Sequence, residues 1–528
     1  MGPIRRHKRR RRPHASRRSC PVVGLVLCAM LALSCTVNPV SGRSEFVLMD
    51  EQDEQELGDR AAVQVEQEIG IVDDPELSAY VEQIGRELAR YSPRQDVEYS
   101  FKIVDMSEPN AFALPGGYVY VSRGLLALAN SEAEVANVIG HEIGHVAARH
   151  AAQRDTASKA LTLLSLLGMI GAAAGGDGTA VAASSAFGPV AIAAYSRGQE
   201  RQADAIAQEL TSRAGIDPKG MATFLRALED TTRLQTGASR IPTFLDTHPG
   251  TGERLAEATT NAETIRWQPR FSIAPTRAAY LAKLDGLVVG PSAREGVFHE
   301  NYFLHADLGF ALRFPRGWYL RNEHSRVMAI APTRDAFTML ELEGPGDDPR
   351  AAAVAYARKN DLVFGETAPI RIGALRAFRA RAKVRTPGGF ADALLTWVAF
   401  DGFVYRLSAG AAGGSLGRYA GIFRSFARGF RPLRPEDLEF VKESRLRIVR
   451  ARDGETIERL SERVDNAWNA NETAVENQLF VGEPLREGTL VKIAHPEPYL
   501  PQPSQPDVAP DADEGNAPVQ GPRRAPRD

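Results

Sequence analysis

Residues 131–153 read SEAEVANVIGHEIGHVAARHAAQ and contain an HExxH pattern at residues 141–145. Ser131, with Glu134 three residues later, forms the capping-box signature of a helix N-terminus. The apolar and polar residues that follow have helical spacing, so the stretch predicts a long helix from about 131 to 153.

The HExxH residues have the spacing of a metal site on a helix. His141 and His145 are four residues apart and project from one helix face, so their imidazoles can reach one zinc ion. Glu142 lies about 100° further round the helix, where it can take a proton from an attacking water. The alternative is a pair of histidines on a solvated helix face.

A catalytic zinc needs a third protein ligand and an open fourth position. Residues 196–204, SRGQERQAD, carry two acids four residues apart on a helical pattern. Glu200 can bind the zinc, and Asp204 can accept the free N–H of a ligand histidine. Considered alone, this segment is equally well explained as a solvent-facing charged helix.

The sequence before this helix predicts two helices and a small sheet. Amphipathic patterns cover 51–69 and 74–91, and the second opens with Asp-Asp-Pro at 73–75. Alternating residues at 97–103 predict a strand, and 111–114 and 118–122 predict two more, joined by a tight turn.

The N-terminus resembles a bacterial lipoprotein signal peptide. Nine Lys or Arg residues and no acid precede a short apolar run, Pro21 to Leu33, which is too short to span a bilayer. Leu-Ala-Leu-Ser-Cys at 31–35 resembles a lipobox, so Cys35 is the predicted lipidation site and membrane anchor. The alternatives are an uncleaved short anchor and a misassigned start codon. The two other cysteines, at 20 and 28, lie in the removed segment, so no disulfide is expected in the mature body.

Charge and length limit the function further. The formal net charge of the 528 residues is −2, and removal of the nine N-terminal cations leaves an acidic body. Nucleic-acid binding needs basic surface, so no nucleic-acid partner is expected. A chain of this length predicts two to four domains.

Five segments, taken in order, resemble the HtpX and CAAX-prenyl-protease family of zinc metallopeptidases. The resemblance is to the gluzincin type, in the soluble BepA-like envelope branch, and it covers roughly residues 35–270. It implies a mainly helical domain with a short sheet, whose active-site helix lies beneath the edge strand. The matching segments are 35–43, 110–117, 141–150, 196–204 and 247–249.

The resemblance implies roles for the residues already singled out. It places one zinc ion per subunit on His141, His145 and Glu200. Glu142 becomes the catalytic base, and Asp204 becomes the partner of a ligand histidine.

The resemblance also adds residues. Asn110 and Ala111 would lie on an edge strand that binds substrate as an added strand. His248 would donate to the oxyanion or cap the zinc, and the alternative is a loop histidine before a proline. Arg254 would orient the site. His150 falls off the ligand face and is expected to be a capping or surface residue.

The remaining sequence is less specific. The apolar stretch from Ala160 to Tyr195 predicts two helices that pack in the core, or alternatively contact lipid or client surfaces. Residues 445–494 resemble a degenerate LysM module, which implies a peptidoglycan contact. The alternative is a small strand-helix-strand cap.

The predicted fold class is α+β multidomain. Strands and helices alternate irregularly over 296–432, with helices near 348–359 and 415–427. The expected organisation is a signal peptide at 1–34, a tether at 35–50, a zinc metallopeptidase domain at 51–270, a linker at 271–295, an α+β accessory domain at 296–432, a LysM-like module at 433–496 and a disordered tail at 497–528.

The sequence thus leads to an expected function. The chain should be a zinc-dependent endopeptidase that cleaves misfolded or stalled cell-envelope proteins, as a lipoprotein on the periplasmic face of the outer membrane. The alternative is a non-proteolytic, chaperone-like or peptidoglycan-binding envelope lipoprotein with a closed or structural zinc site.

Overall fold

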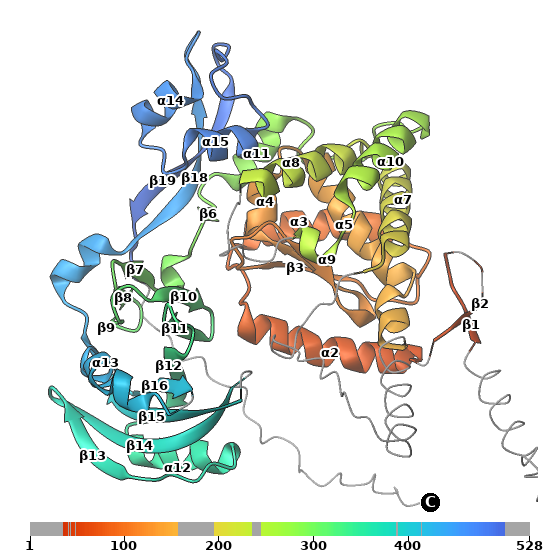
Figure 1. The fold of residues 1–528 in the computed structure, drawn as a ribbon. Coiled ribbons are helices and arrows are strands. Elements are labelled where there is room, and N and C mark those ends of the chain that lie inside the picture. Colours follow the sequence, from red (N-terminus) through yellow and green to blue (C-terminus); the bar gives the residue numbers. More distant parts are fainter. Residues whose placement is uncertain are drawn as a thin grey trace, which may run out of the picture. The chain divides into compact units, whose positions relative to one another are not determined.

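The computed structural model describes residues 35–156, 195–234, 244–386, 389–412 and 414–501, without residues 41, 43 and 48. The chain divides into two compact units, one mainly before and one mainly after Leu284 (Figure 1). The predicted signal peptide, the apolar stretch before Tyr195 and the tail beyond residue 501 lie outside the described residues. Within the described residues, no helix is long and apolar enough to cross a membrane.

The predicted tether is folded onto the first unit, which corrects the expectation for residues 35–50. Val47 and Met49 are buried against Ala152 and form a small apolar cluster with it. Two apolar side chains of a polar segment thus pack against Ala152, more than 100 residues later in the sequence. Only the tertiary structure can reveal such a contact. The segment begins with a hairpin of two antiparallel strands, β1 (Cys35–Val37) and β2 (Ser44–Phe46).

Two predicted helices of the first unit are confirmed as α2 (Glu51–Glu68) and α3 (Pro75–Ala89). The side chain of Asp74 accepts a hydrogen bond from the Leu77 N–H at 2.9 Å and so caps α3. Helix α3 lies directly on the sheet, because a Cβ at Gly85 would come within 2.4 Å of the Phe101 ring.

The predicted small sheet has three strands in the order β3-β5-β4. Strand β3 runs parallel to β5, and β4 runs antiparallel to it, so β3 and β4 form the two edges. The turn between β4 and β5 contains Gly116 at φ 79° and Gly117 at φ 95°, a conformation that glycine adopts without strain. The strands are β3 (Ser100–Val104), β4 (Ala111–Ala113) and β5 (Tyr118–Ser122).

The HExxH residues lie on α5 (Glu132–Ala147), which is buried along almost its whole length and is capped by Ser131 as predicted. The predicted helix is interrupted at residues 148–149, where Arg149 adopts a left-handed conformation at φ 56°, and helical residues resume at 150. Helix α7 (Arg197–Ala214) packs very close to it. A Cβ at Gly140 or Gly144 would lie 3.2 Å from a Cα atom of α7, so a larger residue at either position would make the two helices shift by a few tenths of an ångström.

The predicted linker at 271–295 is also folded. The Glu132 carboxylate accepts hydrogen bonds from the backbone N–H groups of Ile273 and Ala274, and the Tyr280 hydroxyl donates to the Leu126 carbonyl at 2.7 Å. The first part of the segment therefore belongs to the first unit. The other helices here are α4 (Arg123–Leu128), α8 (Gly220–Leu234), α9 (Phe244–Thr247), α10 (Thr251–Thr264) and α11 (Arg277–Leu284).

The second unit contains a seven-stranded antiparallel sheet in the order β10-β11-β12-β16-β15-β14-β13. Val398 and Trp397 belong to separate apolar clusters, since consecutive strand residues point to opposite faces. Helix α13 (Leu416–Arg428) packs into the first cluster and α12 (Pro349–Lys359) into the second. The strands are β10 (Tyr319–Glu323), β11 (Arg326–Ile330), β12 (Ala336–Pro345), β13 (Thr367–Ile372), β14 (Leu375–Thr386), β15 (Gly389–Phe400) and β16 (Phe403–Ala412).

Two smaller sheets complete the second unit. Residues 442–498 run as strand, two helices and strand. This order fits both the LysM-like module and the alternative cap, so both stay predictions. The last strand reaches Pro498, two residues into the predicted tail. One sheet has the order β17-β9-β8-β7 and the other β19-β18-β6. Their elements are β6 (Val288–Val289), β7 (Val297–His299), β8 (Tyr302–His305), β9 (Phe310–Arg313), β17 (Arg431–Pro432), β18 (Lys442–Arg450), α14 (Ile457–Val464), α15 (Ala470–Asn477) and β19 (Leu490–Pro498).

Candidate active site

Three of the predicted metal ligands come together from α5 and α7. The Nε2 atoms of His141 and His145 lie 2.9 Å apart, as the four-residue spacing requires. Oxygens of Glu200, from the first turn of α7, lie 3.6 Å from the His141 Nε2 and 3.4 Å from the His145 Nε2. All three side chains are buried.

His248, just after α9, joins these three residues. Its Nδ1 atom lies 3.1 Å from an oxygen of Glu200 and 3.2 Å from the His141 Nε2. Its ring stacks on Phe244, with centroids 4.1 Å apart. This stacking holds the plane of the His248 ring beside the cluster.

The four residues fit one metal ion. Their donor atoms all lie within 4.8 Å of one another. Imidazole nitrogens and a carboxylate are the donors that zinc prefers. Lone pairs that converge in a buried space repel one another unless a cation lies between them, so the cluster is best explained as a zinc site.

Glu142 lies beside the cluster without a hydrogen-bond partner. Both of its carboxylate oxygens are buried and unpaired among the described residues, and so is the Nε2 atom of His248. This same Nε2 atom lies 3.8 Å from one carboxylate oxygen of Glu142. Burial raises the pKa of Glu142, so the carboxyl group is prepared to accept a proton. Unpaired buried polar atoms of this kind point to a missing polar ligand such as water or substrate.

Asp204 and Arg254 support the ligands. Asp204 accepts a hydrogen bond from His141 Nδ1 at 2.8 Å, which leaves Nε2 as the metal-facing atom. Arg254 donates two hydrogen bonds to Asp204, forms an ion pair with Glu200 at 2.7 Å, and donates to the His248 carbonyl at 3.0 Å. Burial raises the pKa of the Asp204 carboxyl, but the Arg254 guanidinium outweighs it and keeps this pKa below its usual range.

His150 is a site residue that the sequence interpretation missed. It is buried, and its Nδ1 lies 2.9 Å from Nδ1 of His145. Its Nε2 lies 3.1 Å from the Gln202 side-chain oxygen. The left-handed turn at Arg149 brings His150 back to the ligand, and a continuous helix to 153 would have pointed it away. No helical periodicity reveals such a turn.

The side chains of His145, His150 and Gln202 allow one consistent arrangement of protons. Gln202 Oε1 accepts only, so His150 carries its proton on Nε2 and its Nδ1 must accept. His145 Nδ1 then donates, and the lone pair of its Nε2 faces the metal cluster. Burial lowers the pKa of His150 to about 4, which keeps the ring neutral as this arrangement needs.

Replacing His150 with leucine should weaken zinc binding by roughly 10–100-fold, because His145 loses the group that fixes its tautomer. Competition with a chromogenic chelator measures this affinity. Gln202→Leu should act in the same direction with a smaller effect. Unchanged zinc affinity in His150→Leu, with the fold intact by circular dichroism, would contradict the assignment.

The predicted substrate strand lies beside the cluster. Ala111 is on β4, an edge of the sheet, and Asn110 directly precedes it, with its N–H donating to the Ser122 hydroxyl at 2.9 Å. Ala113 of the same strand lines a small cavity together with His145 and Tyr195, so β4 runs next to the metal-facing histidines. The Tyr195 ring stacks on His145, with centroids 3.9 Å apart.

Comparisons with known proteins match this part of the chain. Residues 75–262 match the model of Peptidase family M48. The Beta-barrel assembly-enhancing protease of Escherichia coli (strain K12) is 30% identical over 264 residues, which cover 48% of this chain and 53% of that protein. The protein of the same name from Yersinia pestis is 29% identical over 245 residues, which cover 44% of this chain and 49% of that protein.

A more distant relative is a mitochondrial protein. Mitochondrial metalloendopeptidase OMA1 of Schizosaccharomyces pombe is 28% identical over 220 residues, which cover 41% of this chain and 63% of that protein. The chain spans about half the length of the first two relatives.

The family match and the metal cluster fall on the same part of the chain. All four donors lie between residues 141 and 248, inside the matched range. Residues 75–262 therefore form a Peptidase family M48 domain.

Proposed function

We propose that this chain is a zinc metalloendopeptidase. The observation that carries the proposal is a buried cluster of metal-ligand donors with an unpaired carboxylate, Glu142, beside it. His141, His145 and Glu200 would hold the zinc. When bound, zinc polarises the scissile carbonyl and makes a nearby water more acidic. A purely structural zinc needs no base at the position of Glu142.

Glu142 would act as general base and then as general acid. Its carboxylate takes a proton from the attacking water, and the same proton can pass to the leaving amine. Its raised pKa suits this exchange, because a carboxylate with a raised pKa holds the transferred proton more firmly than an ordinary carboxylate.

The substrate backbone would bind as an added strand on β4. An edge strand offers unpaired N–H and C=O groups, and these recognise an extended chain more than particular side chains. Asn110 and Ala111 would hold the residues next to the scissile bond. Extended or unfolded polypeptide is therefore the proposed substrate class.

His248 would control access to the metal. In the structure its Nδ1 lies among the ligand donors and so occupies the fourth position that catalysis needs open. Rotation of the ring away from Glu200 would free this position. The unpaired Nε2 could then donate to the oxyanion of the substrate.

Replacing His248 with alanine should therefore raise cleavage of unfolded casein several-fold, because the closed state is removed and the competent fraction grows. Initial rates at equal zinc content measure the effect. A loss of about 10²-fold would instead mean that oxyanion stabilisation outweighs closure.

The proposed clients are misfolded or stalled cell-envelope proteins. The names of the bacterial relatives, beta-barrel assembly-enhancing proteases, support this client class. The proposed location is the periplasmic face of the outer membrane, with attachment through lipid on Cys35 and a peptidoglycan contact through residues 433–496. No nucleic-acid partner is proposed.

One observation favours a second function. The closed position of His248 suits a chaperone-like or peptidoglycan-binding lipoprotein whose zinc site is structural. Casein cleavage and zinc content of the protein from residue 36 onward separate the two proposals. Chelator-sensitive cleavage with one bound zinc supports the peptidase, bound zinc without cleavage supports the second function, and absence of zinc excludes both.

A further inference from the structure

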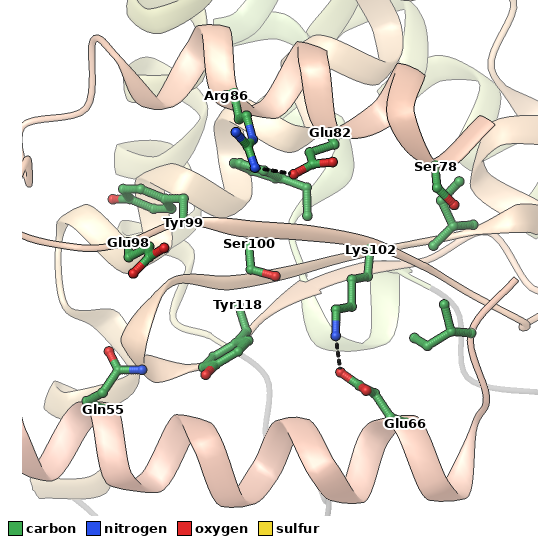
Figure 2. A pocket seen from close by; sticks show the side chains of 13 residues that line it. Gln55, Glu66, Ser78, Glu82, Arg86, Glu98, Tyr99, Ser100, Lys102 and Tyr118 are labelled. Atoms are coloured by element: carbon green, nitrogen blue, oxygen red, sulfur yellow. Dashed lines mark hydrogen bonds and ion pairs between the residues drawn. The ribbon is translucent and has the colours of Figure 1, made fainter. Parts of the chain in front are cut away.

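The first unit contains a groove away from the metal cluster. It has a volume of about 840 Å³ and lies between α2 and α3, along strand β3 (Figure 2). The sheet order β3-β5-β4 puts this strand at the edge opposite β4. The groove is therefore distinct from the proposed substrate strand.

Strand β3 presents its edge to the groove. Six consecutive residues, 98–103, line it. Successive strand side chains point to opposite faces, so a strand seen from one face would contribute only alternate residues. An unbroken run of lining residues means that the backbone itself borders the groove.

The chain already adds a short antiparallel segment to this edge. Ile71 bridges Val104, and the Val72 N–H donates to the Ile103 carbonyl at 2.9 Å. The chain then turns away into α3, whose cap is Asp74. The edge of β3 therefore accepts an antiparallel strand, and this added segment covers only the end of β3 at Ile103 and Val104.

The rest of the edge is uncovered in the described part of the first unit. Ile103 bonds outward, so the two-residue period of the strand turns the N–H and C=O groups of Phe101 outward as well, and the next residue at this period is Tyr99, just before the strand. No strand follows β3 in the sheet order, and no described backbone group bonds to these two residues from the groove side.

The groove walls are polar and mostly paired. Lys102 forms an ion pair with Glu66 of α2 at 2.5 Å, and Arg86 forms one with Glu82 of α3 at 2.5 Å (Figure 2). Glu98, two residues before β3, also lines the groove and makes no ion pair with any described residue. The groove therefore carries one uncompensated negative charge.

These features select one kind of ligand. Outward backbone groups repeat every two residues, about 6.6 Å along the strand, and an extended peptide has the same repeat. A compact small molecule cannot match this repeat, and an apolar ligand would take the charged groups of the walls out of water without replacing that hydration. A basic side chain opposite Glu98 would balance the free charge.

We propose that the free edge of β3 is a second docking strand, which binds an extended, basic segment of a protein client as an antiparallel strand. The client then contacts the domain both here and at β4, so long unfolded chains are held better than short peptides. This proposal depends on the proposed function in one respect, which is that the bound segment belongs to a client protein.

The test uses the full protein with Glu142→Gln, which should bind clients without cutting them. The probe is a fluorescent ten-residue peptide of alternating valine and lysine, and fluorescence polarisation measures its affinity. Ser78, half-buried on the groove wall, is replaced with tryptophan to fill the groove. Thr259→Trp on the exposed side of α10 is the matched control.

The expected result is saturable binding that Ser78→Trp weakens at least tenfold and Thr259→Trp leaves unchanged. Glu98→Lys, a milder surface change, should weaken this peptide and favour a glutamate-containing version. Two further peptides carry N-methyl groups on the odd or on the even residues. Their affinities should differ, because only the peptide whose methylated N–H groups would have faced β3 loses binding.

Three results would overturn the proposal. These are no binding, binding indifferent to Ser78→Trp, and equal loss with both N-methylated peptides. Self-association that Ser78→Trp disperses would also overturn it, by showing that a second copy fills the groove. Casein cleavage by the parent protein is measured separately, so failure of the docking strand and failure of the peptidase proposal give different results.

Discussion

Replacing Glu142 with glutamine should lower casein cleavage by about 10²–10⁴-fold and leave the bound zinc in place. Glutamine has the same shape as glutamate, but its amide cannot take a proton from water. The side chain makes no hydrogen bond among the described residues, so the substitution breaks no contact that holds the ligands. Initial cleavage rates and metal analysis on the same samples measure the two quantities.

The control for this variant is Glu209→Gln. Glu209 is exposed on α7 and, among the described residues, pairs only with Arg213, one helical turn away, so its loss should leave both rate and zinc content unchanged. Parent-like cleavage by Glu142→Gln at equal zinc content would show that another group is the base. Loss of zinc from the same variant would assign Glu142 to metal binding instead.

Replacing Arg254 with methionine should destabilise the metal-free first unit by about 3–5 kcal/mol. Arg254 is buried and contacts the carboxylates of both Glu200 and Asp204. Its removal leaves two buried negative charges without their cation. Native-state hydrogen exchange in α5 and α7 measures the loss in this unit separately from the second one.

The loss should be smaller when zinc is bound, since the metal ion supplies positive charge to Glu200. Arg254→Lys should recover only part of the stability, because a single ammonium group cannot make bonds to two carboxylates and a carbonyl with the same geometry. A change below about 0.5 kcal/mol in metal-free Arg254→Met, as at a surface position, would show that the carboxylates are not held by this residue.

The sequence predicts those parts of the site that depend on local spacing. His141 and His145 share a helix face because they are four residues apart, and the capping signal at Ser131 marks where that helix begins. Glu200 and Asp204 follow the same rule on α7. Each of these predictions uses contacts within one or two helical turns, for which residue spacing is sufficient.

The parts that the sequence does not predict depend on contacts between distant residues. His150 reaches His145 only because Arg149 takes a left-handed conformation, and that residue type rarely does so. The expected tether and linker pack onto the first unit through apolar and carboxylate contacts with residues far away in the sequence. In the second unit several strands are predicted, but the sequence does not give their order, since pairing joins residues as far apart as Val289 and Ser444.

The close contact of α5 and α7 at Gly140 and Gly144 also sets the order in which the protein matures. Two ligands come from one helix, and the third comes from a helix that begins more than fifty residues later. Strong metal binding therefore has to wait until the two helices have docked. A newly made chain has no complete centre before that moment, so the proposed peptidase activity cannot begin while the chain is still unfolded.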